Sequence, residues 1–418
     1  MAQSANPQFA TFSRYLATCG WCFLANEKYT TVRLYNRFTR TTPPEAVLPT
    51  MFRRWDATNA STEGLTGYLK HSLPLVFGHV FQPNGEDFVE RHGTLWCNTY
   101  QQFEPVTDSA DVHPDFLEFL ERLFPDDSER HQSIQWLAHG LRKPEERPSY
   151  HLLLISESGT GKGFLFNEIL KPLLIHTSIA PSFSRVTAQF STVLEDNLLC
   201  LLDDPRKGSD ETMTRMKSIL SEEWALVEHK GETARMVPTF TRFILASNLE
   251  RPLRLDEDDR RWFAPKKLVH RVSKEETQQF LSRLYSWLQQ SDSLSRVYNW
   301  FMQYDLDGFN PKHIPQTDQL RAMIAMSRNA LDDVYADFFA ENPVLHVSDL
   351  QAHIVDAGYT KPQNAAVNHA LVEGGYRSQE LLAEGKRARY WVRKELDRKT
   401  AQTILDGAGQ ACTTPAPF

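Results

Sequence analysis

The feature that most constrains this chain is a glycine-rich segment, Ser156–Gly163, which reads Ser-Glu-Ser-Gly-Thr-Gly-Lys-Gly. An apolar run, His151–Ile155, precedes it, and a helix-like run, Phe164–Leu170, follows it. This order predicts a strand, a tight turn and a helix, which is the layout of a phosphate-binding loop. Gly159 and Gly161 permit the positive φ angles that turn several backbone N–H groups toward a phosphate.

We therefore expect a nucleotide to bind at this loop, helped by the dipole of the helix that follows. Lys162 supplies a point charge for the β- and γ-phosphates. The usual pattern G-x-x-x-x-G-K-[ST] differs at two places, because Ser156 replaces a glycine and Gly163 replaces the hydroxyl that binds Mg²⁺. A plain strand-to-helix turn is the alternative interpretation. The expected nucleotide contacts are Ser158, Gly159, Thr160, Gly161, Lys162 and Gly163.

Composition narrows the class of protein. The chain has 418 residues, 41% of them hydrophobic and 24% charged, with a formal net charge of −7. This balance is typical of a globular protein with two or three domains, and no apolar run is long enough to span a membrane. Contact with nucleic acid must then be local. Cys19 and Cys22 have no second cysteine pair, so we expect a reduced, cytoplasmic protein without zinc.

The chain divides by pattern into six segments, and the predicted fold class is α/β. We expect a P-loop core with a preceding helical segment, an N-terminal α+β region and a C-terminal three-helix unit with two strands. The predicted boundaries are 1–108 for a region of unknown role, 109–147 for helices, 148–270 for the nucleotide-binding core, 271–327 for further helices, 328–396 for the C-terminal unit and 397–418 for a flexible tail.

Polar residues follow two further apolar runs in the core. Leu198–Leu202 leads directly into Asp203 and Asp204, and Phe243–Ser247 leads into Asn248. Parallel strands place their ligands at their carboxyl ends, so these side chains should meet beside the loop. We expect Asp203 to hold Mg²⁺, Asp204 to polarise an attacking water, and Asn248 to contact the γ-phosphate or that water. A solvated acidic turn and a capping asparagine are the alternatives.

Two basic motifs complete the core. Arg260 and Arg261 could contact a phosphate of a nucleotide on a neighbouring subunit. Arginine suits this role because a guanidinium binds phosphate oxygens bidentately. One of them should act as this finger and the other should be structural, and an ion-pair network with the preceding acids is the alternative. His229 and Lys230 lie at the expected tip of a β-hairpin, where Lys230 could contact a phosphate of single-stranded DNA.

Taken together, these motifs resemble the superfamily 3 helicases of phages and plasmids. The resemblance also includes 114–136 and 304–317, which are similar to the segments that flank the core in those proteins. It implies an AAA+-like fold, ATP with Mg²⁺, a homo-hexameric ring on single-stranded DNA, and a trans-acting role for Arg260 or Arg261. Because residues 1–108 contain no set of carboxylates suited to a primase, we expect the primase to be either a separate protein or absent.

The C-terminal unit has the order of a winged helix-turn-helix. Its expected wing carries Lys386, Arg387 and Arg389 among aromatic residues, which suits contact with DNA phosphates. Docking of a protein is the alternative for this unit.

The resulting functional hypothesis is an ATP-dependent helicase, an ATP hydrolase that moves along single-stranded DNA and opens forked or origin duplexes of a mobile element. Two alternatives remain open: a replication initiator that uses ATP as an assembly switch, and a nucleotide-binding scaffold that does not unwind DNA.

Overall fold

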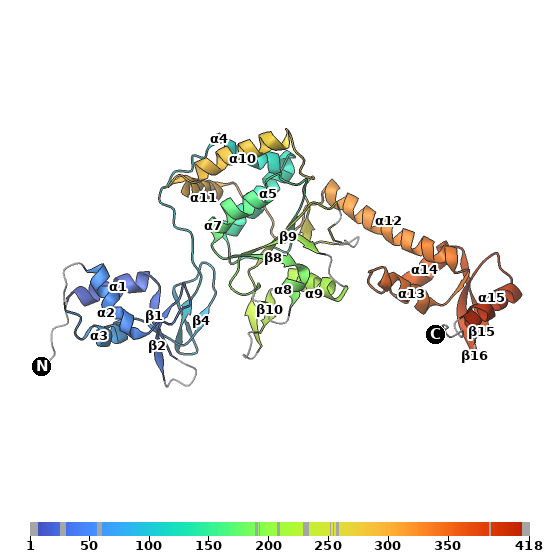
Figure 1. Cartoon of the computed structure of the whole chain (residues 1–418), viewed down its shortest axis with the longest axis horizontal. Coiled ribbons are helices and arrows are strands. Elements are labelled where there is room, and N and C mark those ends of the chain that lie inside the picture. The colour runs from blue at the N-terminus through green and yellow to red at the C-terminus, as the bar shows by residue number, and fades with distance from the viewer. Residues whose placement is uncertain are drawn as a thin grey trace, which may run out of the picture.

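The computed structural model describes residues 7–25, 31–56, 61–188, 191, 193–206, 210–228, 234–250, 252, 253, 255, 259–383 and 386–411. The chain builds an N-terminal unit, a central unit around a parallel sheet and a C-terminal unit, which follow one another from blue to red in Figure 1. The predicted mixed α/β architecture with a parallel sheet is confirmed. No helix in the described part of the chain is long and apolar enough to cross a membrane.

The N-terminal unit combines short helices with two small sheets, ordered β2-β1-β3 and β4-β6-β5. Its core is aromatic, and Phe12 and Phe52 meet edge to face with centroids 5.1 Å apart. The elements are α1 (Pro7–Thr18), β1 (Trp21–Ala25), β2 (Val32–Asn36), η1 (Glu45–Val47), α2 (Leu48–Trp55), α3 (Leu65–Ser72), β3 (Leu75–Val76), β4 (His79–Val80), β5 (Phe88–Arg91) and β6 (Thr94–Asn98).

The central unit is a five-stranded parallel sheet with the order β13-β7-β12-β9-β8. Helices cover both faces, as the continuous apolar runs of its strands predict. The elements are α4 (Pro114–Leu123), α5 (Asp127–Arg142), β7 (His151–Ile155), α6 (Lys162–Phe164), η2 (Leu165–Leu170), α7 (Lys171–Leu174), β8 (Thr177–Ser182), α8 (Phe183–Thr187), β9 (Leu199–Arg206), α9 (Asp210–Ser221), β10 (Trp224–Val227), β11 (Arg235–Pro238), β12 (Arg242–Ser247), β13 (Trp262–Phe263), α10 (Lys274–Leu288) and α11 (Ser293–Gln303).

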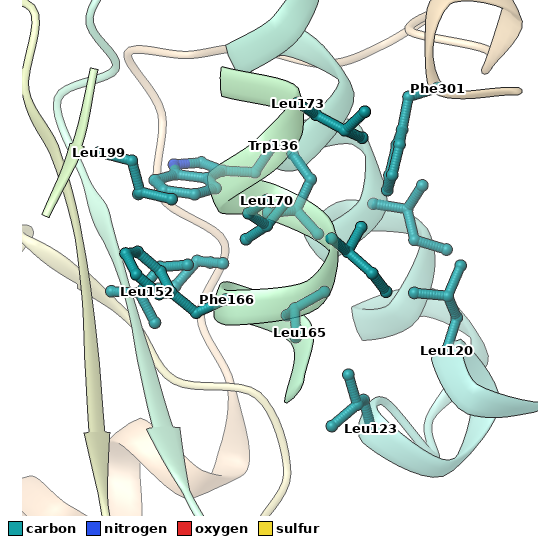
Figure 2. Packing of buried hydrophobic residues seen from close by; sticks show 14 of the residues in the cluster. Leu120, Leu123, Trp136, Leu152, Leu165, Phe166, Leu170, Leu173, Leu199 and Phe301 are labelled. Atoms are coloured by element: carbon teal, nitrogen blue, oxygen red, sulfur yellow. The ribbon is translucent and has the colours of Figure 1, made fainter. Parts of the chain in front are cut away.

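The sheet separates two hydrophobic clusters. Because side chains alternate along a strand, Leu152 and Leu154 of β7 enter one cluster, while Leu153 and Ile155 enter the other. Figure 2 shows the first cluster, where Leu152 and Leu199 from the sheet face Phe166 and Leu170 of the helix after the loop. Burying a large aliphatic or aromatic side chain contributes about 1.5–3 kcal/mol, so this packing holds the loop helix firmly against the sheet.

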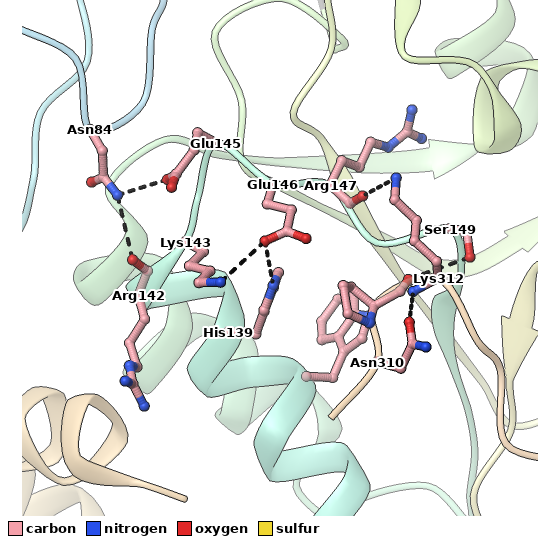
Figure 3. A network of polar contacts seen from close by, with 12 residues as sticks. Asn84, His139, Arg142, Lys143, Glu145, Glu146, Arg147, Ser149, Asn310 and Lys312 are labelled. Carbon is pink, nitrogen blue, oxygen red and sulfur yellow. Dashed lines mark hydrogen bonds and ion pairs between the residues drawn. The ribbon is translucent and has the colours of Figure 1, made fainter. Parts of the chain in front are cut away.

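A buried polar network joins the end of α5 to the start of β12. The Arg242 guanidinium donates to the carbonyls of Lys143 (3.1 Å) and Glu146 (2.9 Å) and contacts His139 Nδ1 (3.0 Å). His139 and Lys143 both point at the Glu146 carboxylate, at 3.4 and 3.6 Å (Figure 3). Burial lowers the pKa of Arg242 to about 9. The cation lies at the carboxyl end of α5, where it compensates the helix dipole.

This network makes stability sensitive to mild acid. Burial and, second, the neighbouring Arg242 lower the pKa of His139 to about 4. An unfolded histidine binds a proton near pH 6.5, so between these values the unfolded chain holds more protons and folding becomes less favourable as the pH falls. We expect His139 to remove about 2–3 kcal/mol of stability between pH 7 and pH 4.5. Urea unfolding of wild type and His139→Asn at both values measures this, and equal losses in the two proteins would contradict it.

The C-terminal unit follows a long helix that leads away from the central sheet in Figure 1. Its sheet has the order β14-β16-β15, and the predicted succession of helices and a hairpin is present. The domain boundaries remain predictions, and α12 runs across the one expected at 327/328. The elements are α12 (Asp318–Glu341), β14 (Val344–Leu345), α13 (Val347–Asp356), α14 (Asn364–Glu373), β15 (Tyr376–Ala383), β16 (Lys386–Arg393) and α15 (Arg398–Ala411).

The prediction of a flexible tail from residue 397 is wrong for its first part, because 398–411 form α15. Ala401 is buried against Leu381 and Val392 of the sheet, and Leu405, one turn later, packs on the same cluster. The Gln402 side-chain amide also donates to the Leu382 carbonyl at 2.7 Å. A short helix with one buried apolar stripe and internal glycines leaves little periodic signal in the sequence.

Candidate nucleotide-binding site

The glycine-rich loop lies at the carboxyl end of β7 and is tied to both sides of it. The Ser156 N–H donates to the Ser247 carbonyl (2.9 Å), and the Glu157 N–H donates to the Leu268 carbonyl (3.0 Å). Gly159 and Gly161 have φ angles of +87° and +108°, in the region that glycine alone adopts readily. The strand, turn and helix predicted around the loop are therefore present.

Gly161 is needed for packing as well as for its backbone angle. A Cβ atom at this position would lie 2.8 Å from Cε2 of Phe119, a side chain of α4. Phe119 is buried in the main hydrophobic cluster, so it has no room to move away. The helical segment before the core thus presses on the turn, which fixes the loop from outside.

The helix after the loop is continuous from Lys162 to Leu174, and its middle part, Leu165–Leu170, is π-helical. Such wider turns occur often at functional sites. Gly163 has open space beside it: the nearest atom to a Cβ placed there is Nδ2 of Asn167, at 3.9 Å. Asn167 is exposed, and we find no hydrogen bond from its side chain to a described residue. The sequence did not single out Asn167.

Three of the predicted site residues form one hydrogen-bonded chain. Lys162 Nζ donates to Oδ1 of Asn248 at 3.0 Å, and the Asn248 side-chain amide donates to Oδ2 of Asp204 at 3.0 Å. The Asn248 backbone N–H donates to Oδ1 of the same carboxylate at 2.9 Å. The strands β9 and β12 are neighbours, so the predicted meeting of Asp204 and Asn248 at one sheet edge is observed.

The two aspartates have different surroundings. Asp204 has a φ of +40°, uncommon for a residue with a side chain, and holds Asn248 as described. Asp203 is exposed, and we find no hydrogen bond or ion pair between its side chain and the described residues. Burial lowers the pKa of Lys162, and the carboxylates of Asp204 and Asp203 partly oppose that shift. The site therefore holds a cation balanced by two acids.

The side chains of Arg260 and Arg261 have different contacts. Arg261 donates from its backbone to Asp259 Oδ1 (2.9 Å) and from Nε to Ser221 Oγ (3.1 Å), at the end of α9. Its Nη1 lies 3.4 Å from the other Asp259 oxygen. Arg260 is exposed, and we find no such contact for its side chain within the described residues. Within the described residues, Arg261 thus has structural partners, and the exposed side chain of Arg260 has none.

The remaining predicted contacts lie away from the loop. The strands β10 and β11 pair antiparallel as the expected hairpin, but His229 and Lys230 are outside the described residues. On the β15–β16 hairpin, Lys386, Arg387 and Arg389 are exposed, and Arg389 lies opposite Glu380. Within the part of the chain that the structure describes, no group of three or more His, Cys, Asp or Glu could hold a metal ion.

One further side chain touches the loop. His270 Nε2 lies 2.9 Å from the Ser158 carbonyl, and its Nδ1 lies 3.1 Å from Oγ1 of Thr277 in α10. Sequence reasoning missed both residues, because a single histidine in a polar stretch has no motif. It follows the short strand β13 by seven residues, and the bridge of nearby Leu268 to Ser156 is what places it beside the loop.

Comparisons with known proteins point to phage DNA replication. Residues 154–261 match a family of unknown function, DUF5906. Over 200 residues the chain is 24% identical to a DNA primase-polymerase of Nitratiruptor phage NrS-1. The aligned segment covers 46% of this chain and 27% of the relative. The chain thus matches little more than a quarter of that relative's length. Two apo structures of the NrS-1 C-terminal region share the fold. The first has a TM-score of 0.55 at 17% identity, and the match covers 91% of this chain and 98% of that structure. The second has a TM-score of 0.56 at 16% identity, and the match covers 93% of this chain and all of that structure, 100%.

These comparisons overturn the functional prediction. An ATP-dependent DNA helicase was expected, but the relative with a named activity is a DNA primase-polymerase. The motifs that suggested a helicase lie on a parallel α/β sheet, and one fold can serve many activities. The expected hexamer and separate primase remain predictions. The chain is similar to a phage DNA replication protein.

Proposed function

We propose that this chain is the nucleotide-binding region of a primase-polymerase type of phage DNA replication protein. Its loop at 156–163 would bind a nucleoside triphosphate such as ATP with Mg²⁺. The observation that carries this proposal is the contact of Lys162 Nζ with Asn248 and, through it, with Asp204, where Lys162 directly follows the turn that contains two glycines with positive φ. The likeness to a DNA primase-polymerase supplies the biological setting.

Each group in the site would make a different contact with the triphosphate. The backbone N–H groups of the turn and the first turn of the following helix suit phosphate oxygens. Lys162 would leave Asn248 for the β- and γ-phosphates, because a charged phosphate is a stronger acceptor than a neutral amide. Asn248 would then stay oriented by the Asp204 carboxylate, with its amide facing the terminal phosphate.

One Mg²⁺ ion fits this site, since an exposed carboxylate and open space adjoin the loop. We assign Asp203 as its protein ligand, directly or through water, and the side-chain oxygen of Asn167 as the substitute for the hydroxyl that Gly163 lacks. The amide of Asn167 lies next to the place where that hydroxyl would stand. Oxygen ligands at a triphosphate are what Mg²⁺ prefers, and the ion would neutralise phosphate charge.

Gly163→Ser should therefore strengthen magnesium-dependent binding. A Cβ atom placed on Gly163 has Nδ2 of Asn167 as its nearest neighbour beyond the adjoining backbone, at 3.9 Å, so the loop should accept a small side chain. We expect the affinity for MgATP to rise about threefold to tenfold, because one hydrogen-bonding group is worth roughly 1 kcal/mol. Titrations with and without Mg²⁺ measure this, with Gly163→Ala as the matched control. Equal gains in affinity in both variants would mean that the higher helix propensity of the new residue, and not a new magnesium ligand, causes the gain.

The C-terminal unit would supply contact with DNA. We propose a winged-helix fold for it, supported by the order of its elements, with the β15–β16 hairpin as the wing. Lys386 and Arg387 are exposed near the turn of this hairpin. Exposed cations at a hairpin tip suit the phosphates of DNA. The AAA+-like description of the central unit, and its place near superfamily 3, stand as proposals about fold.

Neutralising the wing should weaken DNA binding and its dependence on salt. For Lys386→Gln with Arg387→Gln we expect about a tenfold loss of affinity at 100 mM salt and a shallower slope of log affinity against log salt, by up to about 2. Fluorescence anisotropy of a labelled DNA oligonucleotide measures both quantities. Arg377→Gln on β15, whose guanidinium donates to the Leu396 carbonyl, is the matched control. An unchanged slope would exclude the wing from the DNA interface.

The proposed function is tested by ligand selectivity. Calorimetric titration should show tight binding of ATP or dATP with Mg²⁺, weaker binding of diphosphates and little binding of nucleosides. Since the setting is DNA synthesis, a primed single-stranded template should increase the affinity for the triphosphate. Equal affinities for triphosphate and nucleoside would overturn the loop assignment. If the affinity for the triphosphate does not change when DNA is added, the loop assignment still holds, but the proposed role in DNA synthesis is wrong.

A further inference from the structure

A cavity lies between the N-terminal unit and the β10–β11 hairpin of the central unit. It holds about 300 Å³, at the lower end of the range for small-molecule sites, and its lining comes from other segments than the glycine-rich loop. We call it the junction pocket. The β4-β6-β5 sheet and the hairpin line it from two sides, with His79, Arg91 and Trp96 on the sheet and Trp224, Arg235 and Met236 on the hairpin.

The Trp96 ring is held in one orientation on the sheet side of the junction pocket. Its indole Nε1 donates to Oγ1 of Thr94 at 2.9 Å. A Cβ atom on Gly78 would lie 2.3 Å from Cζ3 of the same ring, so the ring packs directly on the Gly78 backbone. An aromatic surface that is already ordered loses little conformational freedom when a flat ligand packs on it.

The hairpin exposes one apolar face beside the junction pocket. Trp224, Leu226 and Met236 are exposed, and Leu226 pairs with Met236 across the two strands. Because side chains alternate along a strand, Ala225 and Val227 point the other way and are buried. Within the described residues, we find no hydrogen bond from the Trp224 indole. Exposed apolar side chains that gather beside a cavity indicate a binding surface.

Contacts behind the junction pocket join the N-terminal unit to the central unit, which carries the hairpin. Phe81, which also lines the pocket, lies edge-on to the His176 ring, with centroids 4.8 Å apart, and its centroid is 6.1 Å from that of Phe240. The Arg40 guanidinium forms an ion pair with Asp196. These contacts fix the two sides of the pocket relative to each other, so it should keep its shape before a ligand binds.

The charges of the junction pocket leave one cation without a partner. Its two carboxylates are each paired with an arginine, Glu195 with Arg235 and Asp196 with Arg40. Arg91 is exposed, and within the described residues we find no ion pair for its side chain. A guanidinium in this position suits a phosphate oxygen.

We propose that the junction pocket binds an unpaired base of single-stranded DNA, with Trp224 and Trp96 as stacking surfaces and Arg91 as the contact for the adjoining phosphate. Every base has a π face, so aromatic rings beside a cation bind a single strand with little regard to sequence. In a duplex the bases are stacked on one another, so only an unpaired or extruded base can enter. This inference goes beyond the nucleotide-binding loop and takes only the setting of DNA replication from the proposed function.

Trp224→Ala should weaken the binding of an oligo-dT strand about tenfold, within the range found when one stacking aromatic is removed. An abasic strand of the same length keeps the phosphates and lacks the bases, so its affinity should stay nearly unchanged. Trp224→Phe should recover most of the loss, because phenylalanine keeps an aromatic face. Fluorescence anisotropy of labelled strands with the full chain measures these affinities. Tyr285→Ala on α10 is the matched control, since Tyr285 is 45% exposed and Trp224 is 54% exposed.

Arg91→Gln tests the phosphate contact separately. It should weaken the binding of both strands alike and make the slope of log affinity against log salt shallower by about 0.7, the value for one phosphate contact on a single strand. The preference for oligo-dT over the abasic strand should remain. An unchanged slope would remove Arg91 from the strand interface.

The outcomes distinguish the strand from other occupants of the junction pocket. Equal losses for the two strands in Trp224→Ala, or no loss for either, overturn the proposal. Binding of thymidine monophosphate that depends on Trp224, with strand binding that does not, assigns the pocket to a free nucleotide and also overturns it. A changed sedimentation coefficient of Trp224→Ala with an unchanged preference for bases assigns the apolar face to a contact between copies of the chain, with the same consequence.

The nucleotide-binding loop is tested independently of the junction pocket. Trp224→Ala should bind MgATP as wild type does in the absence of DNA. If Trp224→Ala loses the preference for bases while Lys162→Ala binds MgATP as wild type does, the junction pocket holds and the loop assignment fails. If Lys162→Ala weakens MgATP binding and Trp224→Ala keeps the full preference for bases, the loop assignment holds and the junction pocket is wrong.

Discussion

Lys162→Ala is expected to raise the dissociation constant for MgATP about 30-fold to 100-fold while leaving the fold intact. The side chain is half-buried beneath the turn, and its ammonium already faces Asn248 at 3.0 Å, so it is held where the phosphates would lie. A hydrogen bond to a charged group contributes about 1.5–3 kcal/mol, which corresponds to roughly 10-fold to 150-fold in affinity. The loss should be large because the partly buried site weakens competition from water.

Calorimetry or a fluorescent nucleotide measures this effect, and Lys171→Ala is the matched control. Lys171 lies on the same continuous helix but is exposed. Urea unfolding should show that both variants keep their stability to within about 1 kcal/mol, since neither removes a buried apolar side chain. Binding by Lys162→Ala that equals wild type would mean that the loop is only a strand-to-helix turn.

The geometry of the site was predictable where it depends on the ends of parallel strands. Asp204 and Asn248 are 44 residues apart in the chain, yet both follow apolar runs, and neighbouring parallel strands bring such ends together. The glycine angles followed equally from residue type, because only glycine adopts them without strain. These features depend on local pattern and on one rule of sheet topology.

Other features could not be predicted, because they depend on contacts between distant segments. Whether Arg260 or Arg261 is structural depends on Ser221, forty residues earlier, and on a hydroxyl that no pattern marks. The contacts of His270 with Ser158 and Thr277 require α10 to begin beside the loop, which a helix prediction cannot establish. The activity was mispredicted for a similar reason: nucleotide-binding motifs describe a site and leave the reaction open.

Arg242→Met is expected to destabilise the protein by about 3–5 kcal/mol, because it removes a buried donor that several backbone carbonyls share. Arg242 is 3% exposed, and its guanidinium donates to the Lys143 and Glu146 carbonyls at 3.1 and 2.9 Å. Methionine fills much of the same volume but donates no hydrogen bond. The carbonyls at the end of α5 would then lose buried partners, which costs about 1–3 kcal/mol for each group that water cannot reach.

Urea unfolding measures this loss, and Arg321→Met is the control, because its ion pair with Asp318 is exposed and should contribute less than about 1 kcal/mol. Arg242 begins β12 and Asn248 follows its end, so at about 3.3 Å per residue they lie roughly 20 Å apart. In conditions where Arg242→Met is folded, its affinity for MgATP should therefore match wild type. A stability loss below about 1 kcal/mol would mean that water replaces the guanidinium at these carbonyls. Lost affinity in the folded variant would instead show that the two ends of β12 are coupled.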